Sequence, residues 1–319
     1  MKYKVIFFNW LLPLLILLIT TLLGIIFGSA GLVWQDFNSD IVLTLRLQRA
    51  AASAVVGSSL ALAGLTLQAV LRNSLAEPFT LGISGGASVG AALAFVLELH
   101  LLSYYIVPAM AWIGALIMLA AVLLTGGRKG VENLLLSGVI AGTAASGVLM
   151  YLVSCADNDE LAGVTWWMLG DLQAVDPVLL YPALAATLIA CVVLHCFGRE
   201  LNALALGSNV AWSIGVPPGF YTVFFIIIGS LLAAQTVALA GMIAFAGLIV
   251  PHLIRRFYGC DHRKIVIPAA LWGGVFMQIC DLLSRLLNPT RELPVGVLTA
   301  VVGGAMFLYV LNKSRESWR

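Results

Sequence analysis

Long apolar runs separated by short polar stretches occupy most of this chain. A helix needs about 20 apolar residues to cross a hydrocarbon core of ~30 Å. A chain of 319 residues has room for ten such helices joined by short loops. The pattern predicts an all-α, polytopic membrane protein with about ten spans, at residues 6–29, 47–70, 80–97, 105–125, 133–154, 177–197, 219–239, 241–257, 265–287 and 294–311.

Composition identifies the solvent of these helices. Hydrophobic residues make up 61% of the chain and charged residues only 10%, so the protein cannot cover itself with a polar surface. We therefore interpret residues 1–319 as a single transmembrane domain. The first run could be a signal peptide, but its apolar core from Val5 to Phe27 exceeds the length of such a segment and favours a retained helix.

Basic residues are distributed unevenly between the two sets of loops. Of the 17 lysines and arginines, 13 lie on one side of the predicted membrane and four on the other. The positive-inside rule makes the richer side cytoplasmic. An even number of spans then places both termini in the cytoplasm.

If a polytopic membrane protein of this kind moves a solute against a gradient, it needs an energy source, and the sequence contains none of the usual ones. An ion-coupled carrier usually has a carboxylate near the membrane midplane. The predicted spans have none there, since Asp281 lies nearer the outer end and Glu98 is terminal. A nucleotide-binding loop with Gly-Lys-Ser/Thr is also absent from the sequence. These observations favour a separate motor subunit and weaken the alternative, an ion-coupled secondary transporter.

The connection between the sixth and seventh spans, residues 199–218, is longer than two neighbouring helices require. Leu201, Leu204 and Ala205 share one helical face, Gly207 permits a sharp turn, and Ser208 or Asn209 can cap a second helix. The pattern predicts two short helices on the cytoplasmic side. An amphipathic helix on the membrane surface is the alternative.

Small residues recur every four positions within two predicted spans. Gly82, Gly86 and Gly90 follow this spacing in the third span, and Gly138 and Gly142 follow it in the fifth. Such spacing is typical of close helix packing in membranes. Lining of a path for a bulky solute is the alternative.

Three arginines, Arg46, Arg49 and Arg285, lie at the outer ends of spans, where the charge rule disfavours them. They either bind a partner or extend toward lipid headgroups. We interpret Arg291 and Glu292 as a local, solvated pair.

Three segments, Asn73–Ser88, Gly241–Arg256 and Glu292–Gly304, resemble in order the motifs of the FecCD family of ABC importer permeases. The resemblance extends from about Arg46 to Leu311. It implies the type II ABC importer permease fold, in a bacterial inner membrane. Its cargo would be an iron-siderophore, haem or cobalamin, moved by alternating access.

The family resemblance also implies partners and site residues. The partners are two ATPase subunits, a second permease subunit, identical or related, and a periplasmic or lipoprotein substrate-binding protein; no nucleic acid is expected. The binding protein would dock on Arg46, Arg49 and Arg285, and Asn73 with Leu75 would belong to a cytoplasmic gate. The residues implied in ATPase coupling are Leu201, Asn202, Leu204, Ala205, Leu206, Gly207, Ala211, Ile214 and Gly215.

Three positions depart from the family pattern, because Gln48, Ser74 and Met306 stand where proline is usual. No catalytic residue, cofactor or metal site is expected. The four histidines lie in distant segments, and His252 is interpreted as structural. A metal ion, if one is carried, would travel inside a chelate.

Overall fold

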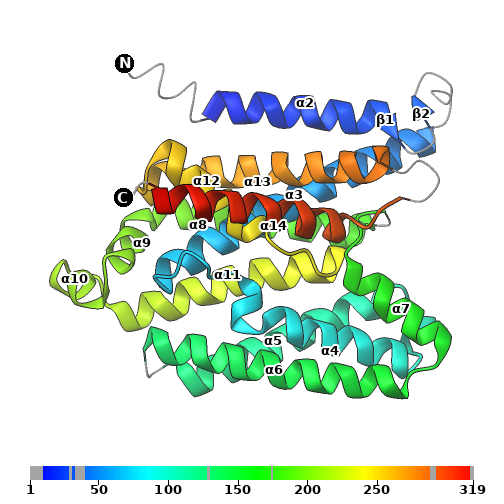
Figure 1. Ribbon diagram of the computed structural model, residues 1–319, viewed down its shortest axis with the longest axis horizontal. Coiled ribbons are helices and arrows are strands. Elements are labelled where there is room, and N and C mark those ends of the chain that lie inside the picture. Colours follow the sequence, from blue (N-terminus) through cyan, green and yellow to red (C-terminus); the bar gives the residue numbers. More distant parts are fainter. Residues whose placement is uncertain are drawn as a thin grey trace.

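The computed structural model describes residues 10–28, 31–32, 40–127, 130–173, 175–287 and 292–316. The described part of the chain is helical apart from one two-stranded hairpin (Figure 1). The elements are α2 (Leu12–Ile26), β1 (Phe27–Gly28), β2 (Gly31–Leu32), α3 (Asp40–Val70), η3 (Pro78–Leu81), α4 (Ile83–Val96), η4 (Leu99–Leu101), α5 (Ile106–Gly126), α6 (Val131–Cys155), α7 (Asn158–Leu169), α8 (Pro177–Cys196), α9 (Gly198–Ala205), α10 (Ser208–Ser213), α11 (Pro218–Ala240), α12 (Ala246–Tyr258), α13 (His262–Leu286) and α14 (Val295–Glu316).

Each predicted span corresponds to a helix of the structure. Among the described residues, six helices are long and apolar enough to cross a membrane, namely α5, α6, α8, α11, α13 and most of α3. Three shorter apolar helices, in α2, α4 and the first part of α14, account for three further spans. The remaining predicted span, residues 241–257, contains α12. The prediction of an all-α protein with about ten spans is therefore confirmed.

The helices run side by side, and the two ends of the bundle carry different elements (Figure 1). One end, which we call the α10 end, carries α9 and α10 together with the start of α2 and the end of α14. The opposite end, which we call the α7 end, carries α7 and the hairpin of β1 with β2.

Helix α3 forms the centre of the bundle. The most apolar window of α3 is 83% buried inside the protein, against 17% for α6 and 22% for α8. Close backbone contact explains how neighbours approach α3: a Cβ atom on Gly57 would lie 2.1 Å from the carbonyl oxygen of Gly273, and one on Gly64 would lie 1.7 Å from that of Gly247. Glycine is therefore required where α13 and α12 cross α3.

The predicted glycine faces also lie at helix contacts. Built Cβ atoms on Gly86 and Gly90 would lie 2.5 Å and 2.1 Å from carbonyl oxygens of α5. A Cβ atom on Gly82 would lie 2.9 Å from the carbonyl oxygen of Gly138 and 3.2 Å from the Cα of Gly142. Helix α4 thus packs on α5 with one side and on α6 with another.

Three local features differ from the predicted spans. The third span is broken, because η3 precedes α4 and Gly82 between them has a positive φ of 70°. The eighth begins at Ala246 and not at residue 241, after a non-helical segment that ends at Phe245 with φ 67°. Helix α7 was not predicted, since its mixture of acidic and apolar residues is too short to register as a span.

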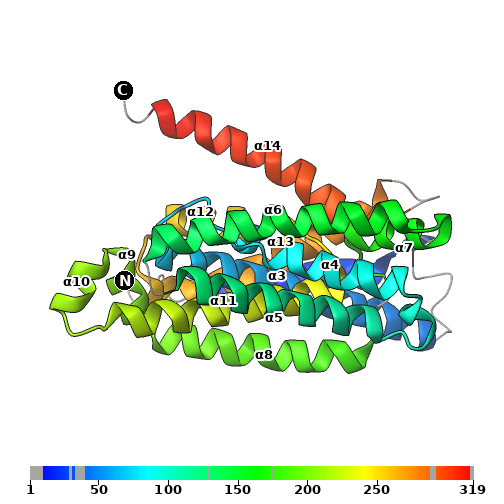
Figure 2. The same cartoon turned by 90° about the horizontal axis from the view of Figure 1, so that it is seen from below.

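Helix α14 leans away from the bundle along its length (Figure 2). Its first turn is fixed by close contact, because a Cβ atom on Gly296 would lie 2.3 Å from the carbonyl oxygen of Leu169. Further along, Val301 is 65% exposed. The same side of the bundle in Figure 2 carries α6.

Candidate functional site

Two arginines and two carboxylates form an ionic cluster at the α7 end. Arg49 Nε lies 2.8 Å from Asp281 Oδ1, and Arg285 Nη2 lies 2.7 Å from Asp281 Oδ2. Arg49 Nη1 also lies 2.7 Å from Glu292 Oε2. Asp281 and Arg285 are 1% and 3% exposed, so this cluster neutralises charges that water does not reach.

Arginines also hold the end of α2. Arg285 Nη1 donates to the carbonyl oxygens of Gly24 at 3.0 Å and Phe27 at 3.2 Å. Arg46 Nη1 donates to the carbonyl oxygen of Ile25 at 3.0 Å. The last carbonyl groups of a helix lack partners within the helix and carry partial negative charge. Two cations from α3 and α13 therefore fix the end of α2.

These contacts change the prediction that Arg46, Arg49 and Arg285 are docking residues. Arg285 was expected either to dock a partner or to extend toward headgroups, but its guanidinium is buried and bound within the chain. Arg46 and Arg49 keep partial exposure beside internal bonds. Glu292, expected in a solvated pair, binds Arg49 in a partly buried position, and Arg291 lies outside the described residues.

At the α10 end, the connection between α8 and α11 folds into α9 and α10, as the sequence predicted. Leu201, Leu204 and Ala211 are buried against the bundle. Ala205, Gly215 and the apolar Leu206 and Ile214 are exposed. The predicted coupling residues therefore divide into a set that attaches the two helices and a set that is open to a partner.

Two further exposed apolar residues of α10 were not predicted. Trp212 is 68% exposed and Val210 is 41% exposed. With Leu206 and Ile214 they make four exposed apolar residues in and around α10, which together we call the α10 apolar surface. Their spacing two apart along a six-residue helix gave no amphipathic signal in the sequence. A group of large apolar side chains on a loop is typical of a protein interface.

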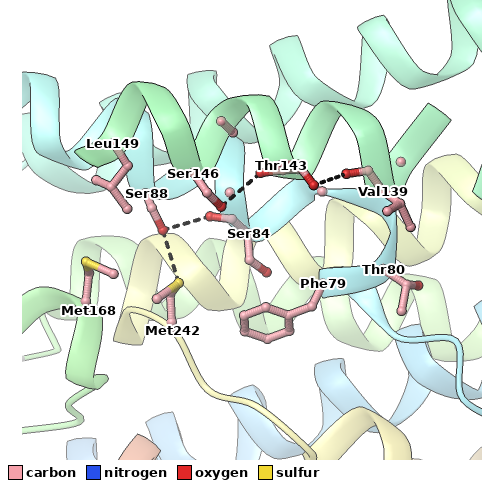
Figure 3. A pocket seen from close by; sticks show the side chains of 15 residues that line it. Phe79, Thr80, Ser84, Ser88, Val139, Thr143, Ser146, Leu149, Met168 and Met242 are labelled. Atoms are coloured by element: carbon pink, nitrogen blue, oxygen red, sulfur yellow. Dashed lines mark hydrogen bonds between the residues drawn. The ribbon is translucent and has the colours of Figure 1, made fainter. Parts of the chain in front are cut away.

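A pocket of about 460 Å³ lies between α4, α6 and the segment that precedes α12 (Figure 3). Its lining contains hydroxyl groups and thioethers and no charged residue. Ser88 Oγ lies 2.9 Å from the carbonyl oxygen of Ser84 and 3.0 Å from Met242 Sδ. The hydroxyl of Ser84 is buried without a hydrogen-bond partner, and Met168 closes one side.

Three of the predicted packing glycines, Gly82, Gly138 and Gly142, also line this pocket. Because these glycines have no side chains, the backbones of α4 and α6 can approach closely. The same absence leaves open space in the pocket beside the contact. Helix packing is therefore confirmed at these three positions, and lining of a path stays a prediction. Gly86 and Gly90 lie on the other side of α4, against α5.

The predicted gate residues form a turn between α3 and η3. Asn73 Oδ1 accepts a hydrogen bond from the backbone N–H of Leu75 at 2.9 Å, and the Asn73 carbonyl oxygen accepts one from Ala76 N–H at 3.0 Å. Leu75 is 48% exposed. The asparagine therefore shapes this turn, and the leucine is presented outward from it.

No group of three or more metal-ligating side chains comes together within the described ranges. Comparisons with known proteins show which chains it resembles in sequence and in fold. The model of the FecCD transport family matches residues 5–313. The ABC transporter permease protein YvrB of Bacillus subtilis, itself uncharacterised, is 35% identical over 302 residues, which are 92% of this chain and 85% of YvrB.

Two further similarities cover almost the whole chain. The vitamin B12 import system permease protein BtuC of Salmonella paratyphi A is 33% identical over 313 residues, 96% of this chain and 95% of BtuC. An inward-facing ABC transporter assigned to the metal-chelate type superposes with a TM-score of 0.86 at 27% identity, over 94% of this chain and 97% of that chain. Sequence and fold thus agree from one end to the other.

Proposed function

The chain belongs to the FecCD transport family, and from this premise we propose that it is the permease subunit of an ABC importer for a metal chelate. It spans the cytoplasmic membrane of its cell with the α10 end and both termini on the cytoplasmic side. The ATP is hydrolysed by two partner ATPase subunits. The excess of basic residues on that side supports this orientation.

The uncharged pocket is the observation that carries the proposal. It holds hydroxyls, thioethers and one aromatic ring, which suit a bulky solute with both apolar and hydrogen-bonding surface. A bare divalent cation would need converging oxygen, nitrogen or sulfur ligands. Met242 of the pocket lining lies near the first turn of α14, since a Cβ atom on Gly296 would lie 2.7 Å from its carbonyl oxygen. The exposed Val301 further along α14 supports a second permease subunit that encloses the path.

The cargo is proposed to be an iron-siderophore, with cobalamin and haem as the competing chelates. Among the competing chelates, cobalamin is supported by the similarity to BtuC, which is named as a vitamin B12 import permease. A soluble binding protein delivers the chelate at the α7 end, where Arg46 and Arg49 are the remaining docking candidates. The ion-coupled carrier is not retained, because the FecCD family consists of ABC transporter permeases.

The test is uptake into vesicles that contain the permease, its ATPase and its binding protein. Ferric siderophore, haem and cobalamin are offered separately, with and without ATP. Ser146 lines the pocket. Ser146→Trp places a large ring there, which should obstruct the pocket and lower uptake by about 10-fold or more. Met150 lies one turn further on α6 at 72% exposure, outside the pocket lining, and Met150→Trp is the control.

Retention of full uptake in Ser146→Trp, with normal assembly, would contradict the pocket as part of the path. Absence of ATP-dependent uptake of all three chelates by the unaltered complex would contradict the proposed function.

The ATPase should also bind less tightly when Trp212 is changed to Ser, because the α10 apolar surface would lose its largest side chain.

A further inference from the structure

One amide side chain connects the loop at the α10 end to a long helix of the bundle. Asn202 of α9 donates from Nδ2 to Asp261 Oδ1 at 2.8 Å. Its Oδ1 accepts the backbone N–H of His262 at 2.9 Å and lies 2.7 Å from His262 Nδ1. Both halves of the amide are thus used on two consecutive residues at the start of α13. We call this set of contacts the α9–α13 clamp.

The clamp acts on the backbone of α13 and not only on side chains. Asp261 is the N-cap residue of α13, and its carboxylate accepts the N–H of Arg263 at 3.2 Å. The His262 N–H is one of the first donors of the helix, which have no partner inside it. Asn202 supplies that partner. A shift of α9 therefore pulls directly on the first turn of α13.

Close packing makes this connection stiff. A Cβ atom on Gly198, the first residue of α9, would lie 2.9 Å from the backbone nitrogen of Arg263. Leu201 and Leu204 of the same helix are buried at 0% and 4% exposure. His262 is 4% exposed, so water has little access to the hydrogen bonds around it.

Helix α10 is attached differently. It follows Gly207, with φ 114°, and precedes Gly215, with φ 82°. Both conformations are open to glycine and costly for other residues, so α10 is bounded by two positions at which the chain turns sharply. The α10 apolar surface faces outward while α9 is fastened to the bundle. A force applied to α10 reaches the bundle through α9.

Helix α13 then extends through the full depth of the bundle. Its 25 residues correspond to a length of about 37 Å. It crosses α3 at Gly273, against Gly57, and its far end carries Asp281 and Arg285 of the ionic cluster. A change of its tilt at the first turn is therefore felt at the α7 end.

We propose that Asn202 is a positioning residue whose amide transmits movement of the ATPase-contacting loop to α13, and that the α9–α13 clamp is required for coupling ATP hydrolysis to uptake. The inference depends on the proposed function, because it assumes that an ATPase holds the α10 apolar surface. It adds a defined route from that surface into the membrane.

The test uses the complete complex of permease, ATPase and binding protein in vesicles. Asn202→Asp removes the Nδ2 donor and sets a carboxylate against Asp261. Uptake of the chelate accepted by the unaltered complex should fall about 10-fold, since the clamp loses its donor and two carboxylates repel each other beside the buried His262. ATP hydrolysis should fall less than uptake, because the α10 apolar surface that holds the ATPase is unchanged. The number of ATP molecules used per chelate therefore rises.

The double variant Asn202→Asp with Asp261→Asn exchanges the amide and the carboxylate. The amide at position 261 can donate to the carboxylate at 202, whose other oxygen accepts from His262, and asparagine remains a good N-cap residue. Coupling should return to within about 2-fold of the unaltered complex, as expected for two residues that act as one pair. Asn158→Ala, an exposed asparagine of α7, controls for loss of an amide.

The possible outcomes distinguish a residue that only maintains the structure from one that transmits movement to α13. Normal uptake in Asn202→Asp, or failure of the exchanged pair to restore coupling in a complex of normal thermal stability, overturns the proposal. If the unaltered complex shows no ATP-dependent uptake, the proposed function itself fails. The proposed role of the α9–α13 clamp, which depends on that function, then fails as well. If uptake and ATP hydrolysis fall together in Asn202→Asp, the residue only maintains the ATPase contact and the clamp does not transmit movement.

Discussion

The two ends of α13 are held by opposite kinds of chemistry. At the α7 end, Asp281 is buried between Arg49 and Arg285, and the cluster contains two ion pairs on one carboxylate. At the α10 end, a neutral amide binds Asp261, whose side chain is 24% exposed and also contacts the 62% exposed Arg263. The first arrangement leaves no charge free, whereas in the second the Asp261–Arg263 pair stays open to water.

This difference indicates which end is fixed and which can move. Removing one partner from a buried ion pair leaves a charge that water cannot solvate, at a cost of about 3–5 kcal/mol. Removing one partner from an exposed ion pair costs only about 0.2–1 kcal/mol, because water solvates the charge that remains. The ionic cluster therefore joins α2, α3 and α13 into one unit, whereas at the α10 end the exposed Asp261–Arg263 pair can exchange with water while the α9–α13 clamp stays closed.

The largest expected effect comes from the centre of the ionic cluster. Asp281→Ala leaves Arg49 and Arg285 facing each other without the shared carboxylate, and should lower the free energy of unfolding by about 3–5 kcal/mol. Thermal unfolding in detergent, followed by tryptophan fluorescence, measures the change. Asp159→Ala removes an exposed carboxylate of α7 and should shift stability by less than about 0.5 kcal/mol. Equal effects of the two variants would show that the ionic cluster is not a structural centre.

A smaller effect is expected at the rim of the same cluster. Glu292→Gln keeps the hydrogen-bonding shape and removes the charge that holds Arg49 Nη1. Because Glu292 is only partly buried, the free energy of unfolding should fall by about 1 kcal/mol. Arg49 would then be freer to bind a carboxylate of the binding protein, and the affinity for that protein should rise at low salt.

Binding of the soluble protein to the reconstituted permease, at low and at high salt, measures this effect. Asp159→Ala again serves as a charge-matched control, since it also removes one negative charge at the α7 end. A lower affinity in Glu292→Gln would mean that Glu292 itself belongs to the docking surface. An unchanged affinity would remove Arg49 from the docking candidates.

The sequence allowed the spans to be predicted because each depends on local composition. A run of about 20 apolar residues needs no knowledge of its neighbours. The two short helices α9 and α10 were also predictable, since Gly207 separates two runs that each form a helix. What could not be predicted was which side chains meet: Asp281 and Arg49 are 232 positions apart, and only the packing of α13 on α3 brings them together.

The same limit explains the errors. The outward orientation expected for Arg285 followed from its position at the end of a span, and the span alone does not reveal that the carbonyl groups of α2 lie beside it. The break before α12 was missed because residues 241–245 are as apolar as a helix would be, while Phe245 adopts a left-handed conformation that composition does not predict. The pocket depends on such breaks, since Met242 in this non-helical segment lines it.

The smallest expected effect concerns the charge at the α10 end. Hydrogen bonds from Arg263, with smaller help from Asn202, hold the pKa of Asp261 well below its usual range. A carboxylate with a lowered pKa in the folded protein stabilises it above the unfolded value of about 3.9, and this stabilisation is lost only as the pH falls through the folded pKa. Between about pH 5 and 8 this carboxylate should therefore contribute no slope to stability or to coupling.

Asp261→Asn tests this expectation, because it keeps an oxygen for the Asn202 amide and an N-cap for α13 while it removes the charge. Exposed Arg263 loses an ion pair that water replaces, so the free energy of unfolding should change by less than about 0.5 kcal/mol. Thermal unfolding and uptake, both measured across that pH range, supply the comparison with the unaltered protein. A loss as large as that of Asp281→Ala would mean that the α10 end is held by charge after all, and that the two ends of α13 do not differ in kind.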